Sequence, residues 1–231
     1  KETLLKNNKA NKEENNEYSF IKYIPNFINE VTTSIIHQEL INEEYTIGKT
    51  DYNSEIPRVQ KWMHNNNLPF SLSWKKQYDR WQPRKYSKEI KKIQDNILNM
   101  YLENNSLPEG VNKPEINSSL INKYRSGNDS IAFHRDNLPE FGENPTILIL
   151  SFGNERSIQF KRVLYNHKNR KSMKIDKDNQ SMNFNIKLEN ASLLIMGGST
   201  QKYYAHGIDK TNNNVGERFS ITFRQHEMCT N

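Results

Sequence analysis

His134 and Asp136 are two metal-binding residue types that stand two positions apart in the segment SIAFHRDN. Side chains at positions i and i+2 of an extended segment point to the same side, so this pair can bind one ion. His206, in YYAHGI, follows the apolar run SLLIMG and is the candidate third ligand from a neighbouring strand. Two histidines and one aspartate are the donor set of non-haem Fe(II) oxygenases. The alternative is an ion pair at a loop surface.

The segment ERFSITFRQ, at 217–225, alternates in the way a strand does. Its two faces are Phe219, Ile221 and Phe223 on one side, and Arg218, Ser220, Thr222 and Arg224 on the other. A small dicarboxylate needs a cation at each end, and the planar guanidinium matches a carboxylate. Because six residues of strand span ~20 Å, both arginine side chains must lean inward to reach one such ligand. The alternative is a solvated polar face.

The elements that position these residues are predominantly strands. From about residue 116, short β-type runs alternate with Gly, Asn and Pro: SSLINKY, SIAF, TILILSF, SIQFKR, FNIKL, ASLLIMG and RFSITFR. Such spacing predicts a sandwich or barrel. The pattern also predicts helices at 29–40, with Asn29 as N-cap, and at 87–102, with Ser87 as N-cap. Both helices are expected to cover a sheet, and residues 163–183 are expected to form a long polar hairpin loop.

The chain of 231 residues suits one integrated domain. We expect a polar, flexible tail at 1–17, a helical layer with a nucleotide-recognition lid at 18–115, and a jelly-roll catalytic core at 116–231. The net charge is +6, which is compatible with a polyanionic partner. A single cysteine, Cys229, excludes an internal disulfide, and the lack of further cysteines argues against a structural zinc site. With no apolar run of about 20 residues, we expect a soluble, intracellular monomer that does not bind membranes.

Several spaced motifs resemble the AlkB family of Fe(II)/2-oxoglutarate-dependent nucleic-acid dioxygenases, closest to its DNA and RNA repair members. They are INKYRSGNDSIAFHRDN, SFGNERSIQFKR, SLLIMGGSTQKYYAH and RFSITFR, in the family's order over residues 116–225. The resemblance implies a double-stranded β-helix, or jelly roll, with iron on His134, Asp136 and His206. It implies 2-oxoglutarate contacts from Asn122, Tyr124, Arg218, Thr222 and Arg224. Arg156 matches a family arginine that we expect to be architectural.

The function implied is oxidative demethylation of N-alkylated bases, such as N1-methyladenine and N3-methylcytosine, in DNA or RNA. O₂ is the cosubstrate, and formaldehyde, succinate and CO₂ are released. The base must be single-stranded or flipped out of its duplex. Two alternatives remain. The same chemistry can act on another substrate, such as N6-methyladenine in RNA or a protein side chain, or the chain can be an inactive nucleic-acid binding module.

The substrate contacts expected from the resemblance and from composition are less sharply defined. They are Arg58, Trp62, Phe70, Leu72, Arg135, Leu138 and Glu140. Leu138 stands where repair members carry an acidic residue, and Glu140 is the nearest acid. Cations interleaved with aromatic residues at 74–88 suit single-stranded nucleic acid, which assigns backbone contacts to Lys75, Lys76, Arg80, Arg84 and Lys85. The alternative is that the aromatic residues of this half are ordinary core residues.

Overall fold

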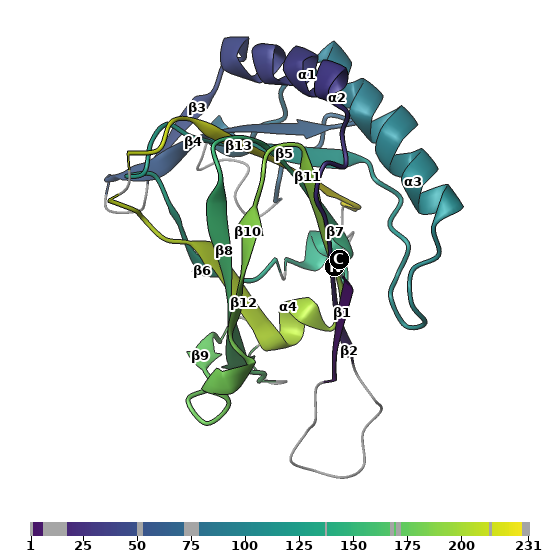
Figure 1. The fold of residues 1–231 in the computed structure, drawn as a ribbon, viewed down its shortest axis with the longest axis vertical. Coiled ribbons are helices and arrows are strands. Elements are labelled where there is room, and N and C mark those ends of the chain that lie inside the picture. Colours follow the sequence, from purple (N-terminus) through teal and green to yellow (C-terminus); the bar gives the residue numbers. More distant parts are fainter. Residues whose placement is uncertain are drawn as a thin grey trace.

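The computed structural model describes residues 2–6, 18–49, 53–71, 79–136, 138–166, 169, 172–212 and 214–227. Two antiparallel sheets face each other beneath a layer of helices (Figure 1). The strands are β1 (Glu2–Lys6), β2 (Tyr18–Ile24), β3 (Thr46–Lys49), β4 (Glu55–His64), β5 (Ser118–Tyr124), β6 (Ile131–His134), β7 (Ile147–Gly153), β8 (Arg156–Leu164), β9 (Lys174–Ile175), β10 (Phe184–Leu188), β11 (Ser192–Gly198), β12 (Tyr204–Ile208) and β13 (Arg218–Arg224).

The larger sheet has the order β1-β2-β11-β7-β13-β5-β4-β3, and the smaller has the order β10-β8-β12-β6, with β9 paired to β8. The helical elements are α1 (Glu30–Asn42), η2 (Asp79–Trp81), α2 (Lys88–Lys92), η3 (Ile93–Leu98), α3 (Asn99–Asn104), η4 (Pro139–Phe141), η5 (Gln180–Met182) and α4 (Thr200–Tyr203). Within the described part of the chain, no helix is long and apolar enough to cross a membrane.

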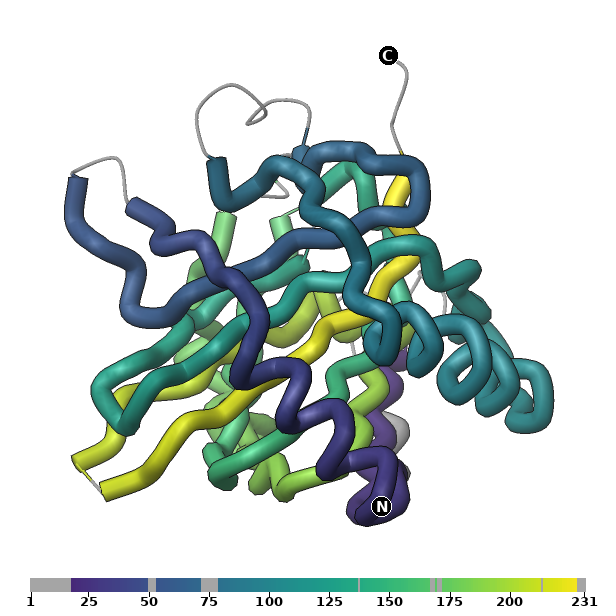
Figure 2. The backbone as a smooth tube through the Cα atoms, turned by 90° about the horizontal axis from the view of Figure 1, so that it is seen from above, coloured from purple at the N-terminus to yellow at the C-terminus, as the bar shows by residue number. Residues whose placement is uncertain are grey.

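Helices α1 to α3 lie across the outer face of the larger sheet (Figure 2). The predicted cap of the first helix is confirmed, since Oδ1 of Asn29 accepts a hydrogen bond of 2.9 Å from the backbone N–H of Thr32. The second predicted helix is a continuous run from Lys88 to Asn104 whose middle turns, η3, are π-helical. Ser87 occupies the N-cap position, but its side chain makes no capping hydrogen bond.

Strand alternation divides the apolar residues between two cores. Phe219, Ile221 and Phe223 of β13 pack toward the helices. The space between the sheets is filled by residues such as Ile158, Phe160 and Leu194. The polar face of β13 also lies between the sheets, where Arg218 is 1% exposed and Arg224 is 4% exposed. The solvated-face alternative for β13 is therefore wrong, and the predicted jelly roll with covering helices is confirmed.

Three segments have a structure that differs from the predicted organisation. Residues 2–6 of the expected tail form β1, which pairs with β2; residues 7–17 lie outside the described part. The segment 18–115 is not purely a helical layer, because β2, β3 and β4 extend the larger sheet at its two ends. β2 pairs with β11, β4 pairs with β5 and β3 pairs with β4, which helical periodicity alone does not reveal. The expected loop at 163–183 contains β9, paired through Val163 and Ile175.

Candidate metal centre and the cavity around it

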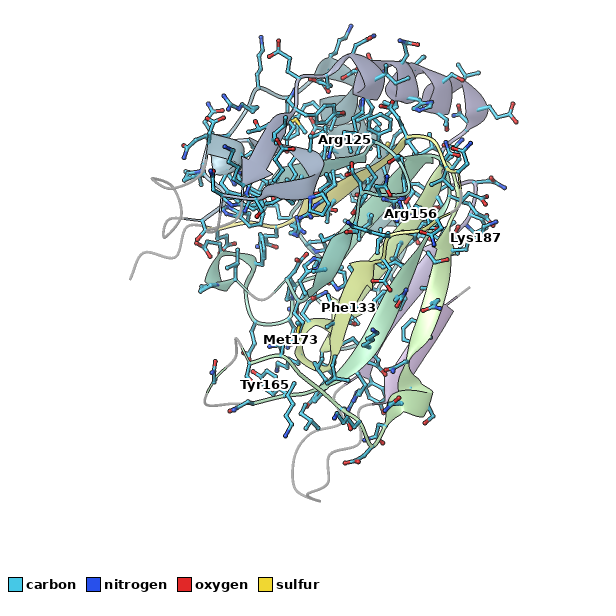
Figure 3. The ribbon with its side chains drawn as sticks, turned by 90° about the vertical axis from the view of Figure 1, so that its left-hand side faces the viewer. Arg125, Phe133, Arg156, Tyr165, Met173 and Lys187 are labelled. Carbon is cyan, nitrogen blue, oxygen red and sulfur yellow. The ribbon has the colours of Figure 1, made fainter. Side chains whose placement is uncertain are left out.

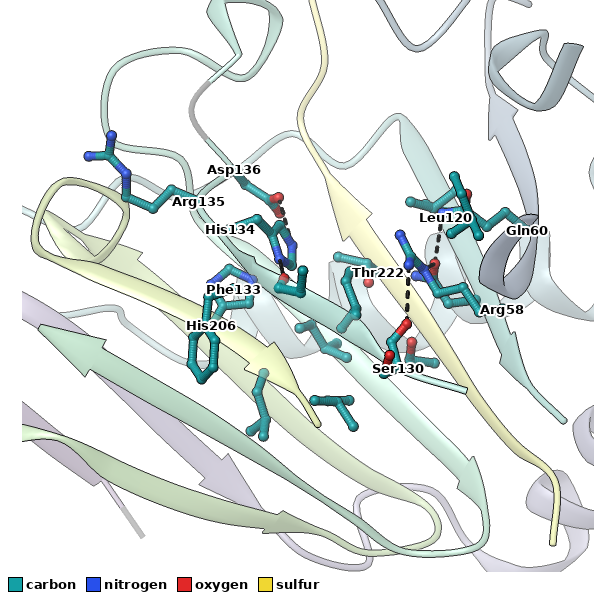
Figure 4. A pocket seen from close by; sticks show the side chains of 18 of the residues that line it. Arg58, Gln60, Leu120, Ser130, Phe133, His134, Arg135, Asp136, His206 and Thr222 are labelled. Carbon is teal, nitrogen blue, oxygen red and sulfur yellow. Dashed lines mark hydrogen bonds and ion pairs between the residues drawn. The ribbon is translucent and has the colours of Figure 1, made fainter. Parts of the chain in front are cut away.

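His134, Asp136 and His206 meet at one end of the smaller sheet, as the spacing predicts (Figure 4). Strand β6 ends at His134, and β12 places His206 directly opposite it in register. One ligand atom from each of the three residues lies within 4.8 Å of the others. Nε2 of His134 is 3.6 Å from Oδ1 of Asp136. This separation leaves room for one ion between nitrogen and oxygen donors, so the three residues fit a metal.

Neighbouring groups orient the three side chains. Nδ1 of His134 lies 2.9 Å from the carbonyl oxygen of Ala132. Because a carbonyl oxygen only accepts, the proton is on Nδ1, and the unprotonated Nε2 is left to bind a metal ion. Oδ2 of Asp136 accepts hydrogen bonds from Nε and Nη2 of Arg224 at 3.0 and 2.5 Å. The backbone N–H of Asp136 donates to Oε1 of Gln201 at 2.8 Å. Oδ1 of Asp136 is thus the oxygen that remains for an ion.

The electrostatics favour the protonation states that metal ligands need. Burial alone would raise the pKa of Asp136, but the charges of Arg224, His134 and His206 lower it to about 2. Burial and the neighbouring His134 lower the pKa of His206 to about 3. Burial also lowers the pKa of His134. At neutral pH the group is therefore one carboxylate and two neutral imidazoles, the form that binds a divalent cation.

A cavity of about 1250 Å³ opens from this group into the space between the sheets. Arg218 and Arg224 both line it. Nη2 of Arg218 donates to Oγ of Ser151 at 3.0 Å, and its guanidinium lies 5.1 Å from the ring centre of Tyr124. Nε and Nη1 of Arg218 and Nη1 of Arg224 are buried without a hydrogen-bond partner among the described residues. Buried cationic donors of this kind fit a carboxylate-bearing ligand such as 2-oxoglutarate.

The other predicted cosubstrate residues, Asn122, Tyr124 and Thr222, also line the cavity. Asn122 lies on β5, opposite Ser220 of β13. Its Oδ1 accepts hydrogen bonds of 2.9 Å from Nε of Arg58 and from Nε2 of Gln60. The expectation that Arg58 contacts the substrate therefore has a competing assignment, because its guanidinium donates to Asn122 and to Ser130 inside the protein.

One end of the cavity is aromatic. Phe70 stacks on Trp81 with ring centres 4.1 Å apart, and Phe141 meets Phe70 edge-on at 5.5 Å. These three residues line the cavity together with Leu138 and Glu140. Oε1 of Glu140 accepts a 2.8 Å hydrogen bond from Oγ of Ser71, and the carboxyl side chain is buried. An aromatic wall with one fixed carboxylate suits a flat ligand that carries N–H groups or positive charge.

Trp62 is not part of this wall, and the expectation that it contacts substrate is wrong. It is 0% exposed, and its Nε1 donates to the carbonyl oxygen of Leu68 at 2.8 Å. It packs edge-on against Phe70, with ring centres 4.9 Å apart. The alternative interpretation of a core aromatic residue is correct for Trp62, because it lies behind Phe70 as seen from the cavity.

Arg135 borders the cavity, but its guanidinium points away from the metal group (Figure 4). Nη1 and Nη2 of Arg135 donate to the carbonyl oxygens of Lys202 and Ser172, at 3.2 and 2.8 Å. It therefore joins α4 to the segment before β9. Arg156, labelled in Figure 3, donates to the carbonyl oxygens of Ser126, Asp129 and Asp209, an architectural role of the expected kind.

The predicted backbone contacts at 74–88 are only partly described. Lys75 and Lys76, like the predicted wall residue Leu72, lie outside the described residues. The guanidinium of Arg80 lies 4.6 Å from the ring centre of Trp81, so Arg80 makes a cation–π contact within the protein. Arg84 forms an exposed ion pair of 2.6 Å with Asp79, and Lys85 is exposed. An exposed pair of this kind exchanges easily for a phosphate contact.

Three residues of the cavity and the metal group were not predicted from the sequence: Gln60, Phe141 and Gln201. Gln60 carried a usable signal, because it stands two positions after Arg58 on a strand and so shares its face. Phe141 and Gln201 carried none, because their positions depend on the turn η4 and on helix α4.

Residues 20–224 match the family model described as the 2OG-Fe(II) oxygenase superfamily. The DNA oxidative demethylase ALKBH2 of Arabidopsis thaliana is 32% identical over 120 residues, covering 47% of this chain and 37% of the relative. The human alpha-ketoglutarate-dependent dioxygenase alkB homolog 3 is 32% identical over 108 residues, covering 47% of this chain and 36% of the relative. The chain thus matches little more than a third of the length of these relatives.

Among solved structures, OsALKBH1 superposes with a TM-score of 0.59 at 16% identity, over 89% of this chain and 97% of that chain. A prolyl hydroxylase from Trichoplax adhaerens, in complex with a hypoxia inducible factor peptide, superposes with a TM-score of 0.56 at 12% identity, over 90% and 83% of the two chains. Both similarities are similarities of fold.

Proposed function

The chain belongs to the 2OG-Fe(II) oxygenase superfamily, and on this premise we propose that it is a dioxygenase that demethylates N-alkylated bases of DNA or RNA. The observation that carries the proposal is the group of His134, Asp136 and His206, with the buried donors of Arg218 in the same cavity. The sequence similarity to AlkB-type demethylases supports nucleic acid as the substrate class.

In this proposal His134, Asp136 and His206 hold Fe(II). Asn122, Tyr124, Arg218, Thr222 and Arg224 bind 2-oxoglutarate, and Arg224 does so through Nη1, the nitrogen that does not bind Asp136. When bound together, iron and 2-oxoglutarate supply the oxidation of a methyl carbon by O₂, with succinate and CO₂ as coproducts. The hydroxylated N-methyl group then breaks down to formaldehyde and the unmodified base.

The chain's own residues prepare the site for this chemistry. Arg218 pairs with one carboxylate of 2-oxoglutarate in a buried setting, where the pair is shielded from water. Arg224 keeps Asp136 ionised and turns its Oδ1 toward the two histidines. The apolar residues Ile149, Ile158 and Leu188 exclude water around the cosubstrate end of the cavity. Excluding water strengthens each of these polar contacts.

The aromatic end of the cavity is the proposed base site. A flipped or single-stranded base can enter it and contact the rings of Phe70, Trp81 and Phe141. Glu140, held by Ser71, offers a carboxylate to N–H groups on the base edge. N1-methyladenine and N3-methylcytosine both carry an amino group and a positive charge at neutral pH. Glu140 thereby supplies the acidic contact that Leu138 does not.

The test is turnover on a panel of methylated oligonucleotides, single- and double-stranded, DNA and RNA, with succinate and formaldehyde both measured. Formation of both products on cationic methylated bases supports the proposal. Turnover confined to N6-methyladenine or to peptides would keep the cofactor chemistry and overturn the substrate. Oligonucleotide binding without any turnover would favour an inactive binding module.

A further inference from the structure

The side-chain amide of Asn122 is held by two donors from the neighbouring strand β4. Its Oδ1 accepts one hydrogen bond from Nε of Arg58 and one from Nε2 of Gln60, each 2.9 Å long. Gln60 is paired with Asn122 in the β4–β5 register, and the two side chains are 1% and 5% exposed. Because the oxygen of Asn122 faces β4, its amide nitrogen is left to face the cavity that Asn122 lines.

Of the two donors, Arg58 sets the polarity of the Asn122 amide, that is, which of its ends faces the cavity. A glutamine amide contains both a donor and an acceptor, so Gln60 and Asn122 could exchange roles by flipping together. A guanidinium only donates, so Arg58 accepts no hydrogen bond from Asn122 in the flipped state. Arg58 is itself fixed, because its Nη1 donates to the carbonyl oxygen of Ser130 at 3.2 Å, next to strand β6 (Figure 4).

The polarity matters for the ligand proposed for this cavity. All five oxygens of 2-oxoglutarate, in two carboxylates and one keto group, are acceptors, so a wall group that faces them must donate. An Asn122 amide with its nitrogen toward the cavity meets this requirement. The flipped amide would place its oxygen against the anionic ligand and leave a buried donor of Arg58 without its partner.

We propose that Arg58 is a positioning residue for 2-oxoglutarate: it holds the Asn122 amide with its nitrogen toward the cosubstrate. This inference rests on the proposed function, and it assigns Arg58 to the cosubstrate instead of the nucleic-acid substrate. Through Arg58, strand β4 contacts a residue at the cosubstrate end of the cavity.

The test is calorimetric titration of 2-oxoglutarate into protein loaded with Mn(II) in place of Fe(II). Arg58→Met should weaken 2-oxoglutarate binding about 10-fold, the loss expected for one hydrogen bond to a charged group. Gln60→Leu should have less effect, within about 3-fold, because Arg58 still sets the polarity. Arg58→Lys, which keeps an obligatory donor, should recover most of the affinity. Equal affinities for wild type and Arg58→Met would overturn the inference.

A double-mutant cycle separates positioning from direct attraction between the Arg58 cation and the dianionic ligand. In an Asn122→Ala background, Arg58→Met should cause no further loss of affinity, because the residue through which it acts is gone. A full additional loss would show direct attraction and contradict the positioning role. Lys123→Met is the matched control: Lys123 neighbours Asn122, but it pairs with Glu217 at 2.8 Å. It removes the same charge and should leave the affinity unchanged.

The same titrations distinguish this inference from the proposed function. If the wild-type protein bound no 2-oxoglutarate, the proposed function would fail. If it bound 2-oxoglutarate and Arg58→Met weakened only oligonucleotide binding, measured by fluorescence anisotropy, Arg58 would be a nucleic-acid contact and only the positioning role would fail.

Discussion

Arg224 and Asp136 form a buried, two-point ion pair, in which Nε and Nη2 of the arginine both bind Oδ2 of the aspartate. The two residues are 88 positions apart in the chain. The pair leaves Oδ1 of Asp136 directed at His134 and His206. Arg224 therefore orients Asp136 through Nε and Nη2, while its Nη1 and the unpartnered donors of Arg218, on the same face of β13, are available to the proposed cosubstrate.

Replacing Arg224 by methionine should reduce metal affinity about 10- to 100-fold, the range for loss of a group that orients a metal ligand. The Asp136 carboxylate would be free to rotate, and its pKa would rise. Anaerobic titration with Fe(II), or with Mn(II) followed by electron paramagnetic resonance, measures the affinity. An unchanged metal affinity would show that Asp136 does not depend on Arg224.

Replacing Arg218 by methionine should leave metal affinity intact and weaken 2-oxoglutarate binding roughly 100-fold, as expected for loss of a buried charged partner. The ligand-free variant should unfold at a temperature no lower than wild type, because the buried guanidinium has donors without partners among the described residues. Thermal unfolding with and without 2-oxoglutarate provides both readouts. A variant still stabilised by the ligand as strongly as wild type would contradict the assignment of Arg218.

Glu140→Gln should lower kcat/KM for N1-methyladenine and N3-methylcytosine by about 10- to 100-fold, the value of one charged hydrogen bond. N3-methylthymine, which lacks an amino group and a positive charge, should be affected little. Glu143→Gln is the control, since Glu143 pairs with Lys202 at 3.3 Å and is 59% exposed. Equal losses on all three bases would indicate a general structural effect and contradict a role in base recognition.

Two histidines behind the aromatic wall contribute, together with His134 and His206, to the pH dependence of the stability of the metal-free protein. Burial lowers the pKa of His64 and of His226, and the rings lie 5.0 Å apart. The unfolded chain therefore takes up protons first as pH falls through about 6.5. The contribution that the neutral histidines make to the stability of the metal-free protein is fully present above this pH. It should decline below it, by at most about 1.4 kcal/mol per pH unit for each histidine.

Urea unfolding between pH 7.5 and 5 measures this slope. His226→Gln should make it shallower by up to one proton. An identical slope in the variant would show that His226 does not contribute to the pH dependence.

Features that depend on a short stretch of sequence were predictable, whereas features that depend on contacts between distant segments were not. The pairing of His134 with Asp136 and the two faces of β13 were predictable, because both follow from alternation along one strand. The partner of Arg224 was not, because it depends on how β13 and the segment after β6 meet in space. The β4 strand was also not predicted as part of the sheet. For that reason Trp62 was assigned to the substrate and Gln60 was overlooked.

The most direct test of the proposed function is a stoichiometric assay on one oligonucleotide that contains N1-methyladenine. Fe(II), 2-oxoglutarate and O₂ are supplied, and formaldehyde and succinate are quantified together. Wild-type protein should release the two products in equal amounts, and Asp136→Ala should release neither while still binding the oligonucleotide. Succinate without formaldehyde, or full turnover by Asp136→Ala, would contradict a demethylase built on this metal group.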